Sequence, residues 1–346
     1  MEMVTVVRLA ALARLPPRGG RSRPPDWDTI RHRVQAAGGR NDLAWRRRRA
    51  DDSGRLALVE EWWMEVQLLA QSSLTESFTV TGARLTVPVR GGKVAVIADV
   101  HGNLPALEAC LAEIGARGAA AVLCAGDVVG YGPWPGACVD VLREAGVVTV
   151  RGNYDTGAGL LLQDCGCAYP TPREQETGAI SLGWTQAVLT PNQREWLAAL
   201  PDLATVTTPG GRPLAVVFHG SPRRVNEYLY EDRPETSLAR LMASEPAPVA
   251  VFGHTHLPYR RMLGPDRLLV NCGSTGRPKH GHPLACYAWL EWPEQLADRP
   301  DADVVGALPS VEIRQVPYDH ARTARAITAC GLPDDFARLI LTGGAR

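Results

Sequence analysis

Short apolar runs alternate with amphipathic segments from residue 93 onwards. The runs KVAVIA (93–98), AAAVLCA (119–125) and VVTV (147–150) have the continuous apolar character of buried strands. Between them, residues 103–117 and 135–145 place apolar side chains at helical spacing. Strands that alternate with helices are typical of βαβ units, so this half is predicted to form a parallel sheet with its ligand sites at the carboxyl ends of the strands.

The pattern changes in the middle of the chain. Residues 156–210 are mainly helical in pattern, and we interpret them as a cap-like insertion beside the site. Short strands then return, and together they predict a second, mixed sheet. These strands are expected near 203–207, 214–218, 249–252, 258–263, 267–271, 284–290 and 311–316. Further helices are expected at 234–244, 319–329 and 333–341.

Residues 1–90 differ in composition from the rest of the chain. Pro, Gly and Arg clusters such as PPRGGRSRPP and WRRRRADDSGR predict loops or disorder, with one helix at 56–71. Two interpretations stay open for this arm. It either contacts RNA or a protein partner through its basic stretch, or it is an extension whose one helix packs on the core. The predicted domains are therefore an N-terminal extension (1–90) and a main domain (91–346).

The amino-acid composition bears on the expected partners and cellular location of the protein. Basic and acidic residues balance at 37 each, so the whole chain has no charge bias toward nucleic acid or anionic membranes. No apolar run reaches the roughly 18 residues of a membrane-spanning helix. The eight cysteines lie mostly in apolar segments, which predicts reduced thiols and a cytoplasmic location. The close pair Cys165 and Cys167 is either part of this core or a metal or redox site.

Polar residues follow five of the predicted strands. They occur in the stretches IADVHGN (97–103), LCAGDVVGYGP (123–133), VRGNYD (150–155), VVFHGSP (216–222) and GHTH (253–256). Each stretch alone is typical of a loop or turn. Together they bring carboxylate, amide and imidazole groups to strand ends that share one crevice, and glycines beside them allow a close approach. This combination predicts two divalent metal ions, and its imidazoles suit Mn, Fe, Zn or Ni rather than calcium.

The same motifs, in this order, resemble those of the calcineurin-like metallophosphoesterase superfamily. Within it, the stretch VGYGP after the Gly-Asp pair is similar to the compact prokaryotic phosphodiesterase-type branch. The resemblance covers about residue 93 to the C-terminus. It implies a fold between the α+β and α/β classes, namely a four-layer αββα sandwich with two mixed β-sheets and the helical cap-like insertion.

The resemblance also implies a ligand set and a reaction. One metal would bind Asp99, His101 and His256, the second would bind Asn153, His219 and His254, and Asp127 would bridge both. The implied activity is hydrolysis of phosphate esters by a hydroxide that bridges the two metals, with phosphodiesters favoured and manganese the expected metal in vitro. The substrate would be a small molecule or a nucleotide.

One position departs from the family pattern. Tyr154 stands where the family usually has a histidine near the leaving group, and Asp155 keeps its expected orienting role. Tyr154 is either a proton donor with an ordinary pKa near 10, or a side chain that only shapes the pocket.

The sequence leaves more than one interpretation open for the substrate-binding residues and for the function. Asn103 is expected near the substrate, and Arg277 either contacts the substrate or belongs to a surface loop. The alternatives to a phosphodiesterase are a phosphomonoesterase and an interaction module with the same fold and little activity.

Overall fold

The computed structural model describes residues 82–89, 92–293 and 308–344. One sheet contains the strands β2 (Lys93–Ile97), β3 (Ala121–Cys124), β4 (Val148–Thr149), β10 (Ala285–Glu291) and β11 (Ser310–Val316). Their order is β11-β10-β2-β3-β4. The strands β2, β3 and β4 run parallel, whereas β10 is antiparallel to both of its neighbours.

The second sheet has six strands. They are β1 (Arg84–Pro88), β5 (Leu203–Thr207), β6 (Pro213–Val217), β7 (Val249–Phe252), β8 (Tyr259–Leu263) and β9 (Arg267–Asn271). Their order is β1-β5-β6-β7-β9-β8, with parallel pairing of β6 with β7 and of β7 with β9. Both sheets are therefore mixed, as the sequence predicted.

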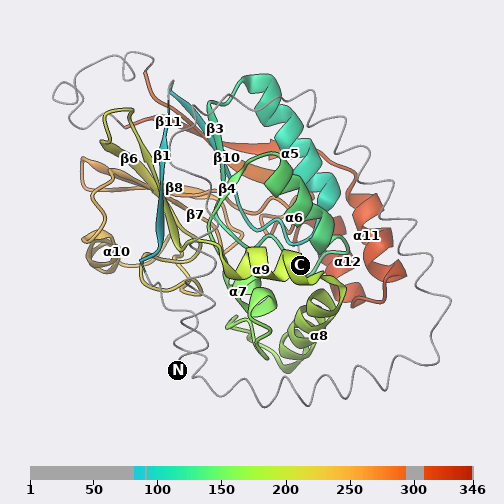
Figure 1. Cartoon of the computed structure of the whole chain (residues 1–346). Helices are drawn as coiled ribbons and strands as arrows, with labels where there is room; N and C mark the ends of the chain where they lie inside the picture. Colours follow the sequence, from blue (N-terminus) through green and yellow to red (C-terminus); the bar gives the residue numbers. More distant parts are fainter. Residues whose placement is uncertain (1–81, 90–91, 294–307, 345–346) are drawn as a thin grey trace.

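Helices cover the outer faces of the two sheets (Figure 1). The helices α5 (Leu104–Arg117), α6 (Pro135–Glu144), α11 (His320–Ala329) and α12 (Asp334–Thr342) lie on the side of the five-stranded sheet. The helix α10 (Glu235–Met242) lies on the opposite side of the molecule and packs on the six-stranded sheet through Leu238 and Met242. The predicted four-layer αββα sandwich is confirmed.

The strand β2 shows why its sequence is a continuous apolar run. Val94 and Val96 join the core between the two sheets, whereas Ala95 and Ile97 face the helices. Successive side chains of a strand point to opposite faces, so a strand in the middle layers needs apolar residues at every position.

The predicted helical insertion is present and is shorter than expected. It contains α7 (Asn153–Gly159), α8 (Pro172–Val188) and α9 (Pro191–Ala198), which gather below the sheets in Figure 1. Capping boxes fix the starts of α8 and α9, with Thr171 and Glu174 in the first. The strand β5 begins at Leu203, so the residues after 202 belong to the six-stranded sheet and not to the insertion.

Two further expectations need correction. The domain does not begin at residue 91, because β1 pairs in parallel with β5 and is an edge strand of the six-stranded sheet. The last two strands also do not join the second sheet. Instead β10 pairs with β2, because Tyr287 and Trp289 bury their rings against the helices there. The helix expected at 56–71 and the basic arm lie outside the described residues.

Among the described residues, none of the helices has the length and apolar character that crossing a membrane requires.

Candidate metal centre

Seven polar side chains meet where strands of both sheets end. Asp99 and His101 follow β2, Asp127 follows β3, and Asn153 follows β4 and begins α7. The remaining three side chains come from the six-stranded sheet: His219 after β6, and His254 and His256 after β7. All seven are buried, with at most 4 % of their surface exposed. The structure thus brings together every residue predicted as a metal ligand.

The side chains form two groups with the spacing of metal ligands. Asp99, His101 and His256 make one group, and Asp127, His219 and His254 make the other. Within each group the ligand atoms lie within 4.8 Å of one another. Oδ2 of Asp127 also lies 3.7 Å from Nε2 of His101, so this carboxylate faces both groups.

The backbone around these ligands is strained. Five of the seven have left-handed φ angles: Asp99 (51°), His101 (47°), Asp127 (54°), His254 (68°) and His256 (61°). Residues with a Cβ rarely adopt this conformation, and such residues cluster at functional sites.

Two glycines permit the close approach of the ligand loops. A Cβ on Gly152 would overlap Oδ1 of Asp127, and a Cβ on Gly253 would overlap Oδ2 of Asp99. Only glycine fits where these backbones pass the two carboxylates.

Hydrogen bonds fix the tautomers of three histidines. Nδ1 of His101, His219 and His256 lies 3.0, 2.7 and 2.6 Å from the carbonyl oxygens of Val129, Ala125 and Arg277. A carbonyl only accepts, so each Nδ1 carries a proton, and each ring in its neutral form directs the lone pair of Nε2 into the centre. This is the usual support for a metal-bound histidine.

The donor atoms fit metal ions. Nε2 of His101 and Nε2 of His256 are only 3.2 Å apart, and two neutral rings in these tautomers repel each other across that gap. Oδ1 of Asp99 is buried without a hydrogen-bond partner, and Nδ1 of His254 lies 3.1 Å from Nε2 of His219. An unpartnered buried acceptor is costly, and a cation bound by Oδ1 of Asp99 removes that cost. Imidazole and carboxylate donors suit transition metals.

The loop that contains Cys165 and Cys167 holds Asn153. The amide nitrogen of Asn153 donates to the carbonyl of Cys165 (2.9 Å) and to Sγ of Cys167 (3.1 Å). Its oxygen therefore faces Nε2 of His219, 3.1 Å away. Sequence reasoning considered this cysteine pair only as core, metal site or redox site, and it missed the positioning role.

Asp155 joins two of the ligand loops. Its carboxylate accepts hydrogen bonds from the N–H groups of Asp127 (2.8 Å), Val128 (2.8 Å) and Gly152 (2.9 Å). Burial and the nearby charge of Asp127 raise the pKa of Asp155 to about 7, whereas the N–H groups of Gly152 and Val128 favour the ionised form. Asp155 thus holds the loops of Asp127 and Asn153 in register.

The ring of Tyr154 packs edge-on against that of His101, with the ring centroids 5.5 Å apart, and its hydroxyl is directed at Tyr169. Its ring is fully buried against Gly130 and Tyr131, and its hydroxyl lies 3.1 Å from the hydroxyl of Tyr169. Burial raises the pKa of Tyr154 well above 10. This geometry favours a packing role over proton donation.

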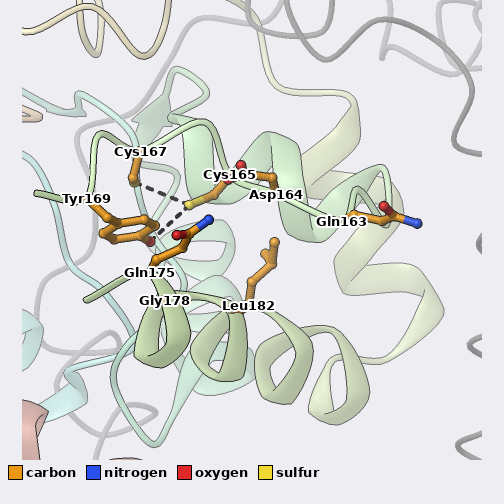
Figure 2. Close-up of a pocket in the computed structure, with 9 residues that line it drawn as sticks. Gln163, Asp164, Cys165, Cys167, Tyr169, Gln175, Gly178 and Leu182 are labelled. Carbon is orange, nitrogen blue, oxygen red and sulfur yellow. Dashed lines mark hydrogen bonds between the residues drawn. The ribbon is translucent and has the colours of Figure 1, made fainter. Parts of the chain in front are cut away.

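A pocket of about 290 Å³ is lined by the loop of Cys165 and Cys167 and by residues of α8 (Figure 2). Tyr169 lies beside the two cysteines, and Gln175 and Leu182 come from α8. Sγ of Cys165 is 3.2 Å from Sγ of Cys167. Cys165 and Cys167, which line this pocket, are also the residues to which the amide of Asn153 donates.

Arg277 lies beside the first group of ligands. Its guanidinium stacks on the ring of Tyr131, 4.0 Å from the ring centroid, and that ring packs edge-on against His101. Nε of Arg277 is buried without a hydrogen-bond partner, and within the described residues the guanidinium makes no ion pair. Arg277 is therefore a rigidly held cation that lacks an anion.

Asn103, the other residue predicted to contact substrate, is fully engaged elsewhere. Its amide donates to the carbonyl of Gly276 (2.7 Å), and its oxygen accepts from the hydroxyl of Thr323 (2.9 Å). The side chain is 1 % exposed and caps α5. It ties the loop before α5 to the loop of Arg277, and its contact with substrate stays a prediction.

The protonation of the histidines predicts how metal binding depends on pH. Burial lowers the pKa of His101 to about 3 and those of His254 and His256 well below 6.5, so these rings are neutral. Burial also disfavours the charged form of His219, but the carboxylates of Asp127 and Asp99 outweigh it and raise the pKa of His219 to about 9. Without metal, His219 therefore holds a proton at pH 7.

Metal affinity should consequently increase with pH until His219 loses this proton. Between pH 6 and 9 the affinity of its site should rise about tenfold per pH unit, because one proton leaves as the metal binds. Calorimetry of Mn²⁺ binding in buffers of different ionisation enthalpy measures this proton release. His219→Gln should remove the released proton, and equal proton release by both proteins would contradict the assignment.

The fold and the site together define a class of protein: a two-sheet sandwich with two candidate metal-binding groups at the ends of its strands. The profile described as calcineurin-like phosphoesterase superfamily domain matches residues 93–295. The chain belongs to this superfamily, and it is a hydrolase of phosphoric ester bonds.

Several known proteins are similar to this chain. An uncharacterised protein of Methanocaldococcus jannaschii is 29 % identical over 268 residues, which is 72 % of this chain and 98 % of the relative. The phosphodiesterase YfcE of Escherichia coli is 29 % identical over 58 % of this chain and 87 % of its own length. The crystal structure of a metallophosphoesterase from Sphaerobacter thermophilus matches with a TM-score of 0.56 and 27 % identity, over 73 % of this chain and 99 % of that one.

Proposed function

We propose that this protein is a dinuclear-metal-dependent phosphodiesterase. The observation that carries the proposal is the pair of ligand groups that Asp127 joins, with the unpaired guanidinium of Arg277 beside them. The similarity to a protein named phosphodiesterase supports the choice of diesters.

In the proposed function, different residues would bind the metal ions and the phosphate group of the substrate. When bound, two divalent ions would neutralise charge on phosphoryl oxygens and lower the pKa of water. Asp99, His101 and His256 would hold one ion, Asn153, His219 and His254 the other, and Asp127 both. Manganese fits this donor set, as do iron, zinc and nickel. Arg277 would bind a non-bridging phosphoryl oxygen, since its fork of N–H groups matches phosphate geometry.

The proposal is tested with two chromogenic substrates. The Mn²⁺-loaded protein should hydrolyse bis-p-nitrophenyl phosphate faster than p-nitrophenyl phosphate. Arg277→Met should lower kcat/KM for the diester by about 10- to 100-fold, as expected for a lost charge-assisted contact. Arg240→Met is the matched control, because Arg240 is exposed on α10 at the opposite side of the molecule.

Two outcomes would favour the alternatives. Turnover of the monoester far above that of the diester would assign the protein as a phosphomonoesterase. Two bound metal ions with no turnover of either ester would favour an interaction module.

A further inference from the structure

Two of the eight cysteines, Cys165 and Cys167, lie side by side in the loop between α7 and α8. Their Sγ atoms are 3.2 Å apart, and both residues line the pocket of about 290 Å³ (Figure 2). All eight cysteines lie within the described residues, and none of the other six lines this pocket. The pair therefore has surroundings that set it apart from the remaining thiols of the chain.

The backbone holds the two sulfur atoms in this arrangement. Gly166 lies between the cysteines with a left-handed φ of 69°, which bends the chain. Its N–H donates to Oδ1 of Asp164 (2.8 Å), and its carbonyl accepts from the amide of Asn226 (3.0 Å). A disulfide bond is about 2.05 Å long, so the two sulfur atoms need to approach by only about 1 Å to form one.

The pocket connects this pair with the surface. Gln163, Asp164 and Gln175 line it, and all three are exposed. Since a water molecule takes about 30 Å³ in the liquid, the pocket has room for a small hydroperoxide. Cys167 is partly exposed, whereas Cys165 is 2 % exposed. An oxidant in the pocket therefore reaches the sulfur of Cys167 first.

The same sulfur atom supports a residue of the metal centre. The amide nitrogen of Asn153 donates to Sγ of Cys167 (3.1 Å) and to the carbonyl of Cys165 (2.9 Å). Asn153 is fully buried, and its oxygen faces Nε2 of His219, 3.1 Å away. If Sγ of Cys167 moves to bond with Cys165, the amide of Asn153 loses one of its two acceptors, and the orientation of its oxygen is no longer fixed on both sides.

We propose, on the basis of the dinuclear-metal function above, that Cys165 and Cys167 are a redox modification site: a hydroperoxide oxidises them to a disulfide, which weakens metal binding through Asn153. A reductant such as a small thiol would restore the pair by exchange.

The oxidation balances with hydroperoxide as the only co-reactant. The sulfur of Cys167 attacks one peroxide oxygen and the O–O bond breaks, so that Cys167 becomes a sulfenic acid and the second oxygen leaves as an alcohol, or as water, with the thiol proton. The sulfur of Cys165 then forms the S–S bond while the S–O bond breaks, and the hydroxide leaves as water with the proton of Cys165. The two thiols lose two electrons, and the peroxide gains them.

Peptide mapping of the full chain after treatment with hydrogen peroxide tests the modification. Trypsin releases residues 152–173 as one peptide, which contains these two cysteines and no others. Its mass should fall by two hydrogens, it should take up no alkylating reagent, and dithiothreitol should reverse both changes. A sulfinic acid in place of the disulfide, or two free thiols in this peptide after Cys330 has been oxidised, would overturn the proposal.

Two variants make this result specific. Cys330→Ser is the matched control, because Cys330 is the other partly exposed cysteine and lies at the end of α11, outside the pocket. It should leave disulfide formation in the peptide unchanged. Cys165→Ser should abolish the disulfide, because Cys167 then has no second sulfur beside it. Loss of the disulfide in Cys330→Ser would assign the modification to a different pair and overturn the proposal.

Calorimetry of Mn²⁺ binding tests the connection to the metal centre. Oxidation should weaken the binding of one ion about tenfold or more, as expected when a group that orients a metal ligand is displaced. By linkage, Mn²⁺ should favour the dithiol by the same factor. The reduction potential of the pair should then rise by about 30 mV for each tenfold change in affinity. A potential that does not respond to Mn²⁺ would overturn the connection.

Hydrolysis of bis-p-nitrophenyl phosphate separates this inference from the proposed function. If the reduced, Mn²⁺-loaded protein hydrolyses the diester but the peptide keeps both thiols in peroxide, the function stands and the redox site fails. If Mn²⁺ shifts the potential of the pair while neither chromogenic ester is hydrolysed, the phosphodiesterase function fails and the redox site stands.

Discussion

Replacing Asp127 with asparagine is expected to lower kcat/KM of the Mn²⁺-loaded protein by about a thousandfold or more, since metal-ion catalysis supplies several kcal/mol. Oδ2 of Asp127 lies 3.7 Å from Nε2 of His101 and 3.4 Å from Nε2 of His219. Asparagine keeps the shape of the side chain but removes its negative charge and directs either an oxygen or an N–H₂ group at the ions. Hydrolysis of bis-p-nitrophenyl phosphate and the metal content by mass spectrometry measure the effect.

Asp266→Asn provides the control for this experiment, because Asp266 is exposed in the turn between β8 and β9. It should retain the parent rate and the parent metal content. Two bound ions together with a near-normal rate in Asp127→Asn would show that this carboxylate does not bridge the metals.

Asp155→Asn is expected to reduce the free energy of unfolding by about 3 kcal/mol or more, since several charge-assisted hydrogen bonds are lost at once. The fully buried carboxylate accepts from the backbone of Asp127, Val128 and Gly152. An asparagine retains one acceptor oxygen and turns an N–H₂ group toward a backbone N–H. Urea unfolding of the metal-free protein gives the free energy directly.

Asp319→Asn is the matched control for this loss of stability. Oδ1 of Asp319 also accepts from a backbone N–H, that of Arg322 (2.8 Å), but at the exposed start of α11. Asparagine caps helices as well as aspartate does, so this change should cost about 0.5 kcal/mol or less. Similar losses in both variants would argue against a loop-joining role for Asp155.

The elements of the sandwich could be predicted because nearly every strand is buried on both faces or ends at a glycine. The run KVAVI is apolar throughout, since one side of β2 packs on the other sheet and the other on helices. Strand pairing was harder to predict. Nothing local in the residues of β10 shows that it pairs with β2, because this choice depends on where Tyr287 and Trp289 find a helical layer to pack against.

The metal ligands could be predicted because each follows closely after a strand. The apolar run that marks the strand in the sequence therefore also marks where its ligand lies, at the end of that strand. The residues that support the ligands could not be predicted. The link from Cys167 to Asn153 and the stack of Arg277 on Tyr131 join segments that only the fold brings together. The same holds for Asn103, whose four polar contacts to distant loops and helices hold it in place next to the site.

The left-handed backbone of five ligands also bears on how this protein can evolve. A left-handed residue with a Cβ is less stable than glycine there by about 1 kcal/mol. Two of these five side chains nevertheless also support the fold, since Asp99 and Asp127 accept hydrogen bonds from the buried N–H groups of His254 and Tyr154. A lineage that gave up catalysis would therefore be expected to keep the two aspartates longer than the histidines, because their loss would leave buried N–H groups without an acceptor.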